Sequence, residues 1–503
     1  MEDYQQQGIV LSVNSSEKIM GGIARKKTWL VVFVALLIAL AVSLASLPSG
    51  LNSNFRSVAH ADPKGIKYLG GGSCGGTGCH SEDVKNPKPV KEPGHDEATI
   101  WKENDGHARA YEDKVKKRKG LLNKDTAKIV AKLKLDKPAG ESPRCLACHA
   151  LTGFSNAESK VRIPLDFTKD VAADDVAKGR FKPNDGVSCD ACHGPSEKYL
   201  TPHQTVGWTE KMRKSTDSAK LYDEWGLYNT KDLHFRANVC VSCHLRIDPD
   251  MVDAGHPVPT FELDDKSHGK WMHWRPNGDY FGPKAWAMGQ FTCVREAALQ
   301  LDERIKAKAK EELITEGYKQ LVSHVLMALH AAKAVSPELQ AKLSASMAAI
   351  NTNWADPAKV EPELHAMGKT ADTLCEKFNE QISKADFKGK DFLDAMLKDV
   401  ATEGEVAGKL GFHGALQYSY AMTALIESEM LAGMAPNPDP DAMKKMFTEK
   451  GGDKYKAGAG VADTALVEAA DFKADEFTAA VKKVMALYPG GAAIALPPGG
   501  PVK

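Results

Sequence analysis

The chain has 503 residues, of which 43% are hydrophobic and 26% are charged, as is ordinary for a globular protein of two or three domains. Lysine plus arginine and aspartate plus glutamate number 66 each, so the formal net charge is zero. This balance argues against nucleic acid or an anionic membrane surface as the main partner. The functional signal must therefore come from motifs and their spacing.

A long apolar run lies close to the N-terminus. Three basic residues at 25–27 precede an uncharged stretch at 29–47 that is just long enough to span a bilayer. We expect residues 1–28 to be cytoplasmic and 29–47 to be a transmembrane anchor that holds the rest of the chain on the periplasmic side of the inner membrane. The alternative is a signal peptide cleaved after Ala61, at the end of "AHA", which leaves a soluble periplasmic protein.

Three short motifs dominate the segment 62–285, which holds eight of the ten cysteines. They are "CLACH" at 145–149, "CDACH" at 189–193 and "CVSCH" at 240–244. Each has the C-x-x-C-H spacing of c-type haem attachment, in which two thiols add to the two vinyl groups of one haem. The histidine that follows the second cysteine is then the proximal iron ligand.

The alternative chemistry for paired cysteines is a zinc site or a redox dithiol. Neither requires a histidine after every pair, whereas here a histidine follows all three. The sequence therefore predicts covalent haem c, held by Cys145, Cys148 and His149, by Cys189, Cys192 and His193, and by Cys240, Cys243 and His244. Because this segment shows little helical periodicity, we expect haem to fill much of its interior.

A fourth site has a stretched spacing. "GGGSCGGTGCHSED" at 70–83 places Cys74, Cys79 and His80 in a C-x4-C-H pattern, and its glycines make two looped-out residues sterically cheap. Beside three regular sites, this stretch predicts a fourth haem. A surface loop closed by a disulfide between the two cysteines is the alternative.

The chain changes character near residue 285, where alanine, leucine, lysine and glutamate become common. Apolar residues recur every three or four positions from Leu339 to Ile350 and from Leu364 to Phe378, which predicts amphipathic helices. Ser336-Pro337 and Asp356-Pro357 are typical helix starts. Further helices are expected at 412–434 and 474–487. We therefore predict a helical bundle over 286–488 and a disordered Gly/Pro tail over 489–503.

The remaining cysteines and several histidines lie in this C-terminal part. Cys293 and Cys375 are interpreted as buried thiols, with a disulfide between them as the alternative. His324 and His330 are six positions apart on one predicted helix, so they point to different faces and cannot grip one metal ion. We interpret these two, together with His365 and His413, as structural residues. No phosphate-binding loop or nucleophile elbow is present in the sequence.

With these motifs in order, residues of about 70–245 resemble the tetrahaem cytochrome c-554 family. The resemblance depends on the attachment sites together with "WKENDGHARA" (101–110), "GVSCDACHGPSEKYLTPH" (186–203) and "LHFRANVCVSCH" (233–244). It implies that His203 is the distal ligand opposite His80, that His107 faces His193 and that His234 faces His244. It also implies a second haem, at His149, with an open distal side.

The chain departs from that family in three ways. The first attachment site is C-x4-C-H, and the intervals from Trp101 to His107 and from His234 to Cys240 are each about one residue longer. A further segment at 253–274 lies beyond the family core and contains His256, His268 and His273. Any of these could supply a ligand to the second haem, and His256 is our first candidate.

The fold class expected is mainly α, with a multihaem cytochrome domain of little regular structure followed by the helical bundle. The function expected is electron transfer in a respiratory chain between donor and acceptor proteins, and the resemblance implies a hydroxylamine-oxidising type of donor. The bundle is a candidate surface for docking or homo-oligomerisation. Two alternatives stay open: a haem enzyme that reduces nitric oxide or a similar small molecule at an open second haem, and a zinc-binding scaffold.

Overall fold

The computed structural model describes most of the chain after residue 64. The predicted anchor at 29–47, the predicted cleavage site at Ala61, and His268 and His273 lie outside the described residues. Among the described residues, every helix falls short of the length and apolar character that a bilayer crossing requires. The described residues are 65–76, 79–81, 96–112, 120–123, 125–150, 152–154, 162–164, 178, 182–204, 218–264, 280–432 and 472–501.

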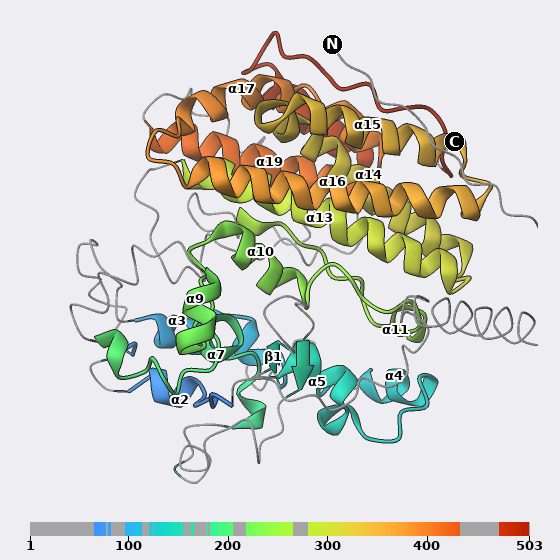
Figure 1. Ribbon diagram of the computed structural model, residues 1–503. Helices are drawn as coiled ribbons and strands as arrows, with labels where there is room; N and C mark the ends of the chain where they lie inside the picture. The colour runs from blue at the N-terminus through green and yellow to red at the C-terminus, as the bar shows by residue number, and fades with distance from the viewer. Residues whose placement is uncertain are drawn as a thin grey trace, which may run out of the picture. The chain divides into compact units, whose positions relative to one another are not determined.

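The cytochrome part, residues 65–264, consists of short helical turns joined by irregular chain (Figure 1). Its regular sheet is a single antiparallel pair of three-residue strands, β1 and β2, with Gly153 opposite Ile163. The helical elements are α2 (Gly71–Cys74), α3 (Glu97–Asn104), η1 (His107–Arg109), α4 (Thr126–Lys132), η2 (Ala139–Glu141), α5 (Pro143–His149), η3 (Pro183–Asp185), α7 (Cys189–His193), η4 (Pro202–Gln204), α9 (Ser218–Trp225), α10 (Leu233–Val241) and α11 (Pro249–Ala254), and the strands are β1 (Thr152–Phe154) and β2 (Arg162–Pro164).

Long helices make up the C-terminal part. They are α13 (Phe281–Lys306), α14 (Glu311–Val335), α15 (Pro337–Thr352), α16 (Pro357–Ile382), α17 (Gly389–Ala401), α18 (Gly404–Lys409), α19 (Phe412–Leu431) and α21 (Ala474–Met485). Helix α13 packs along α14 and α16, and α19 packs against α13, α14 and α17 (Figure 1). The fold is therefore mainly helical, as the sequence predicts.

The helix starts and apolar spacing predicted for two helices of the bundle are confirmed. Helices α15 and α16 start with Pro337 and Pro357 in their first turns, directly after Ser336 and Asp356 at the N-cap positions. The residues spaced by three or four in these two helices face inward and are all buried, namely Leu339, Leu343, Met347, Ile350, Leu364, Met367, Ala371, Leu374 and Phe378. Burial of this apolar stripe is the main force that fixes both helices in the bundle.

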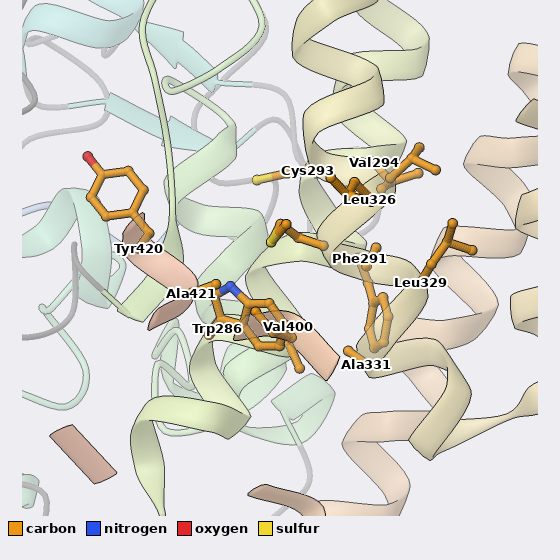
Figure 2. Packing of buried hydrophobic residues seen from close by; sticks show 14 of the residues in the cluster. Trp286, Phe291, Cys293, Val294, Leu326, Leu329, Ala331, Val400, Tyr420 and Ala421 are labelled. Carbon is orange, nitrogen blue, oxygen red and sulfur yellow. The ribbon is translucent and has the colours of Figure 1, made fainter. Parts of the chain in front are cut away.

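The hydrophobic core of the bundle extends into the cytochrome part. Trp286, Phe291 and Val294 of α13 are fully buried in one apolar cluster that also contains Leu326 of α14 and Val400 of α17 (Figure 2). The same cluster includes one face of α10 and its continuation, through Leu233, Ala237, Val241 and Leu245, together with Phe261 and Leu263. Helix α10 is therefore held by the bundle core, although it carries an attachment cysteine. The predicted boundary between residues 285 and 286 falls inside α13, and a division into two domains stays a prediction.

The tail after Pro489 differs from the expected disorder in its described part, 489–501. The backbone N–H of Ala492 donates to Asp399 at 2.8 Å, and the Asn351 side chain donates to the Pro497 carbonyl at 2.6 Å. These bonds hold an extended chain against α15 and α17. Proline has no backbone N–H, so a proline-rich segment leaves few backbone donors that need a partner when it lies along the bundle.

The cysteines and histidines of the bundle have structural surroundings. Cys293 and Cys375 are buried thiols, which agrees with the first interpretation and not with a disulfide. His324 contacts the Gln290 amide oxygen at 2.9 Å. In a separate buried pair, His330 contacts Glu403 at 2.9 Å. His365 contacts Asp302, and His413 contacts Glu316.

Candidate functional site: four haem attachment sites

The first attachment site is a compact turn around Cys74, Cys79 and His80. Cys74 ends α2, and its carbonyl accepts a hydrogen bond from the His80 backbone N–H at 3.3 Å. The His80 Nδ1 atom lies 2.8 Å from Glu97 of α3. In the described residues of this site, Cys74 and His80 are thus joined by a backbone hydrogen bond, and the imidazole is held at Nδ1.

The second site lies on α5, whose first turn contains Pro143. Cys145 lies in the first turn of this helix and Cys148 and His149 in the last, and the His149 Nδ1 atom lies 2.8 Å from the Ala110 carbonyl oxygen. Burial raises the pKa of the Cys145 thiol. Burial also lowers the pKa of His149, which keeps the imidazole neutral, the form that binds a metal ion.

The third site is the helical turn α7, which spans the motif from Cys189 to His193. Gly194 ends this turn with φ 83°, and a Cβ atom there would lie 2.1 Å from the Gly226 carbonyl oxygen, so only glycine fits. The His193 carbonyl accepts hydrogen bonds from the Tyr228 N–H at 3.0 Å and from the Tyr199 hydroxyl at 3.2 Å.

The fourth site forms where α10 ends. Cys240 lies in the last turn of the helix, and its carbonyl accepts from the N–H groups of Cys243 at 3.1 Å and His244 at 3.0 Å. Asp232 caps the start of α10 by accepting from the Phe235 N–H at 3.0 Å. All four predicted sites therefore place their second cysteine and its histidine on one tight turn.

Histidine rings face one another at three of these sites. The ring of His80 lies 6.1 Å from that of His203, between centroids, with the planes 9° apart. His244 lies 5.9 Å from His107 with perpendicular planes, at 90°. The ring of His149 lies 6.1 Å from that of His256, at 71°.

These separations match two imidazoles bound to one iron from opposite sides. A metal–imidazole bond is about 2 Å long, so two facing ring nitrogens across one iron lie about 4 Å apart and the ring centroids about 6 Å apart. The Nδ1 atoms are held from behind: that of His203 lies 2.9 Å from the Tyr199 carbonyl, and that of His107 lies 3.0 Å from Asp105. Such bonds orient Nε2 towards the metal, as is usual for ligating histidines.

One pair of rings differs from the pairs that the resemblance implies. The ring of His107 lies beside that of His244, whereas the resemblance pairs His107 with His193 and His234 with His244. His234 is in the first turn of α10, and His244 follows the last turn of that helix. Because a helix rises about 1.5 Å per residue, these two histidines are well separated along the helix axis, so a pairing of His244 with His107 of η1 fits this geometry better. The full ligand set stays a prediction.

The attachment sites touch one another in a definite order. An interaction with the Cys189 side chain, together with burial, raises the pKa of the Cys74 thiol, so the first and third sites are adjacent. Cys192 of the third site and Phe235 of α10 both pack against one apolar cluster of Tyr222, Tyr228 and Val239, which joins the third site to the helix that leads to the fourth. The fourth and second sites meet where the Cys243 thiol approaches the Ala147 carbonyl oxygen at 3.7 Å.

Some residues that shape the sites escape a motif search. Asp190, inside "CDACH", is fully buried and accepts from the backbone N–H groups of Leu69 at 2.8 Å and Gly70 at 3.0 Å, which fixes the chain before the first site to the third. Glu97 and Asp105 are the acidic partners behind His80 and His107. An acidic residue two positions before a candidate ligand, as in "DGH", is the one sequence signal that points to such a role.

The described residues offer no support for zinc. Within them, one group of three or more His, Cys, Asp or Glu side chains is close enough to hold a metal ion, and it contains Asp302, Glu361 and His365 without a cysteine. Lys306 already bridges its two carboxylates, at 2.9 and 2.6 Å. The thiols of the described attachment sites are instead arranged one pair to each histidine, which fits haem.

Paired thiols, an adjoining histidine and a second ring across a metal-sized gap define a multihaem c-type cytochrome. Residues 77–194 match the sequence model of the family described as Cytochrome c554 and c-prime. This match supports the cytochrome c-554 family for that part of the chain and implies covalently bound haem c, and the helical C-terminal part lies outside the matched residues. Neither the curated proteins nor the solved structures gave a match.

Proposed function

We propose that this chain is an exported tetrahaem cytochrome that carries electrons in a respiratory chain. The match to the family supports a c-type cytochrome with a role in electron transfer. The proposal of electron transfer is supported mainly by the histidine rings that lie opposite one another at the attachment sites. An iron held between two imidazoles has no position left for a substrate. When bound, haem supplies one-electron redox chemistry at each site.

The ligand set proposed here assigns one histidine to each side of each haem. His80 is paired with His203, and His244 with His107. For the third haem we assign His234 opposite His193, because Phe235 and Val239 of the helix that carries His234 share an apolar cluster with Cys192 of this site. The second haem, at His149, is treated separately below.

The contacts between sites support a path that does not follow the chain order. We propose that the sites follow the spatial order first, third, fourth, second. Electrons that enter at either end of this row then pass between neighbouring sites. Buried residues such as Asp190 and Tyr228 reduce the access of water to the middle of the row. Burial and nearby charges are the means by which the protein sets each potential.

Partners and location are part of the proposal. The apolar run at 29–47 supports tethering to the inner membrane, with the haems on the periplasmic side, or export after cleavage at Ala61. We propose redox proteins as donor and acceptor, with a hydroxylamine-oxidising type of enzyme as the donor implied by the family resemblance. The helical bundle offers a surface for docking or for homo-oligomer formation.

The test is a haem count combined with a redox titration of the matured full-length protein. Mass spectrometry and a pyridine haemochrome assay should give four covalent haems per chain. The oxidised protein should take up four electrons and return them to a soluble mediator without consuming nitric oxide. A chain without covalent haem, or one that turns over nitric oxide rapidly, contradicts the proposal.

A further inference from the structure

The second haem of this chain differs from the open haem that the family resemblance implies. We propose that His256 is its sixth ligand and that Arg144 holds His256 in place, so that this haem is closed to external ligands. This inference rests on the proposed function, because it assumes that haem is attached at Cys145 and Cys148.

The two imidazoles are set to grip one metal ion. Their centroids lie 6.1 Å apart, the same separation as in the pair of His80 and His203. The Nδ1 atom of His149 lies 2.8 Å from the Ala110 carbonyl, and that of His256 lies 2.7 Å from the Pro257 carbonyl. Both rings are therefore anchored through Nδ1, which leaves Nε2 as the nitrogen that binds iron on each side.

His256 is presented by a short and well-fixed element. It follows α11 directly after Gly255, whose φ of 109° turns the chain sharply, and the His256 N–H donates back to the Met251 carbonyl at 2.9 Å. Met251 and Ala254 are buried, so one face of α11 is packed. The ring position of His256 thus depends on where α11 lies.

Arg144 ties α11 to the helix that carries the proximal ligand. It stands on α5, one residue before Cys145, and its guanidinium donates to Asp248 at 2.9 and 3.2 Å and also to Asp250. These two carboxylates are at the N-cap and in the first turn of α11. One arginine therefore joins the proximal and distal elements of the same haem, and α11 is further held by Lys310, which pairs with Asp253 at 2.5 Å.

The residues 249–256 lie outside the part of the chain that matches the family, which ends at residue 194. The sixth ligand is thus supplied by an element that comes after the fourth attachment motif. A haem closed in this way takes part in electron transfer, whereas an open one also binds small molecules such as nitric oxide or carbon monoxide.

The experiment compares spin state and carbon monoxide binding in the matured full-length protein and in His256→Ala. The ferric wild type should be low-spin throughout in electron paramagnetic resonance, and the reduced wild type should bind little carbon monoxide. In His256→Ala, about one haem of the four should become high-spin, and about one carbon monoxide per chain should bind. The matched control is His365→Ala, which removes a bundle histidine and should leave both readouts unchanged.

Arg144→Ala tests the positioning role without touching a ligand. Loss of the clamp should raise the rate of carbon monoxide binding about 3- to 10-fold, because α11 then releases His256 more often. In Arg144→Lys the rate should lie between those of the wild type and Arg144→Ala, because lysine keeps the positive charge. Lys333→Ala removes an ion pair between two bundle helices and should not change the rate. Unchanged binding in Arg144→Ala would overturn the role of the clamp.

The outcomes separate the two proposals. A wild type with four haems, one of them high-spin and unaffected by His256→Ala, overturns the closed second haem and leaves the proposed cytochrome function intact. A haem count of zero in the same preparations overturns the proposed function itself. Four low-spin haems in the wild type, with one of them becoming high-spin in His256→Ala, would support both the closed second haem and the proposed cytochrome function.

Discussion

His80 and His203 face each other with their ring planes only 9° apart, whereas the planes of His107 and His244 are perpendicular. The first pair combines the proximal histidine of the stretched motif with a residue of η4, and the second combines η1 with the chain after α10. The angle between axial ring planes decides the shape of the low-spin ferric signal. The two sites should therefore be distinguishable by spectroscopy.

Removal of each distal histidine should delete a different signal. Nearly parallel rings give a rhombic low-spin spectrum, and perpendicular rings give a strongly anisotropic one. His203→Ala should remove a rhombic component from the electron paramagnetic resonance spectrum, and His107→Ala should remove one strongly anisotropic component. Each variant serves as the control for the other. The same component lost in both variants would contradict the ligand assignment.

Asp190→Asn should raise the reduction potentials of the first and third haems by tens of millivolts, because a buried negative charge stabilises the oxidised iron. The Asp190 carboxylate accepts two backbone N–H groups, which favours its charged form. A spectroelectrochemical titration measures the shift. Glu197→Gln is the matched control, since this exposed carboxylate also accepts a backbone N–H, from Lys67 at 2.9 Å. Equal shifts in both variants would argue against an effect of burial.

The stretched first site predicts a specific change in haem number. The double variant Cys74→Ala and Cys79→Ala should retain three covalent haems where the wild type has four, as measured by mass spectrometry. Cys293→Ala removes a buried thiol of the bundle and should keep four. A wild-type count of three, unchanged in the double variant, would show that "CGGTGCH" does not bind haem.

A fall in pH should lower the free energy of unfolding of the bundle, because His324 is buried. Burial lowers the pKa of this histidine to about 3, against 6.5 for an ordinary histidine. Because the folded pKa is the lower one, the unfolded chain takes up the proton first, and stability is lost as the pH falls from about 6.5 towards 3. Between pH 7 and pH 5 this loss is about 2 kcal/mol.

Denaturant unfolding followed by far-ultraviolet circular dichroism at the two pH values measures that loss. His324→Gln keeps a polar side chain opposite Gln290 and should reduce the pH-dependent loss by about 2 kcal/mol. His365→Gln replaces a half-exposed histidine of the same bundle and should leave the loss as in the wild type. An unchanged pH dependence in His324→Gln would contradict the assignment.

The sequence predicts the attachment residues because their spacing is dictated by the porphyrin itself. It also predicts α15 and α16, because proline starts and apolar residues at every third or fourth position are local signals. Distal ligands are different. The nearness of His107 to His244 depends on how η1 packs beside the end of α10, and no local pattern encodes it.

The tail shows a second limit of local reasoning. Its Gly/Pro composition is typical of disorder, yet residues after Pro489 are bonded to Asp399 and Asn351 of the bundle. Partners that are about a hundred residues away in the chain supply the order. Asp190 was likewise hidden, because its role depends on Leu69 and Gly70, which are distant in sequence.

The inclusion of α10 in the apolar cluster of the bundle has a consequence for biogenesis. Leu233, Ala237 and Val241 are buried by helices that contain no attachment cysteine, so their packing does not depend on iron or porphyrin. We therefore expect α10, which carries the first cysteine of the last attachment motif, to pack on the bundle before haem is attached, and the segments with the earlier motifs to become ordered when haem binds. When the chain is produced without haem, proteases should digest its N-terminal half and leave a resistant C-terminal fragment.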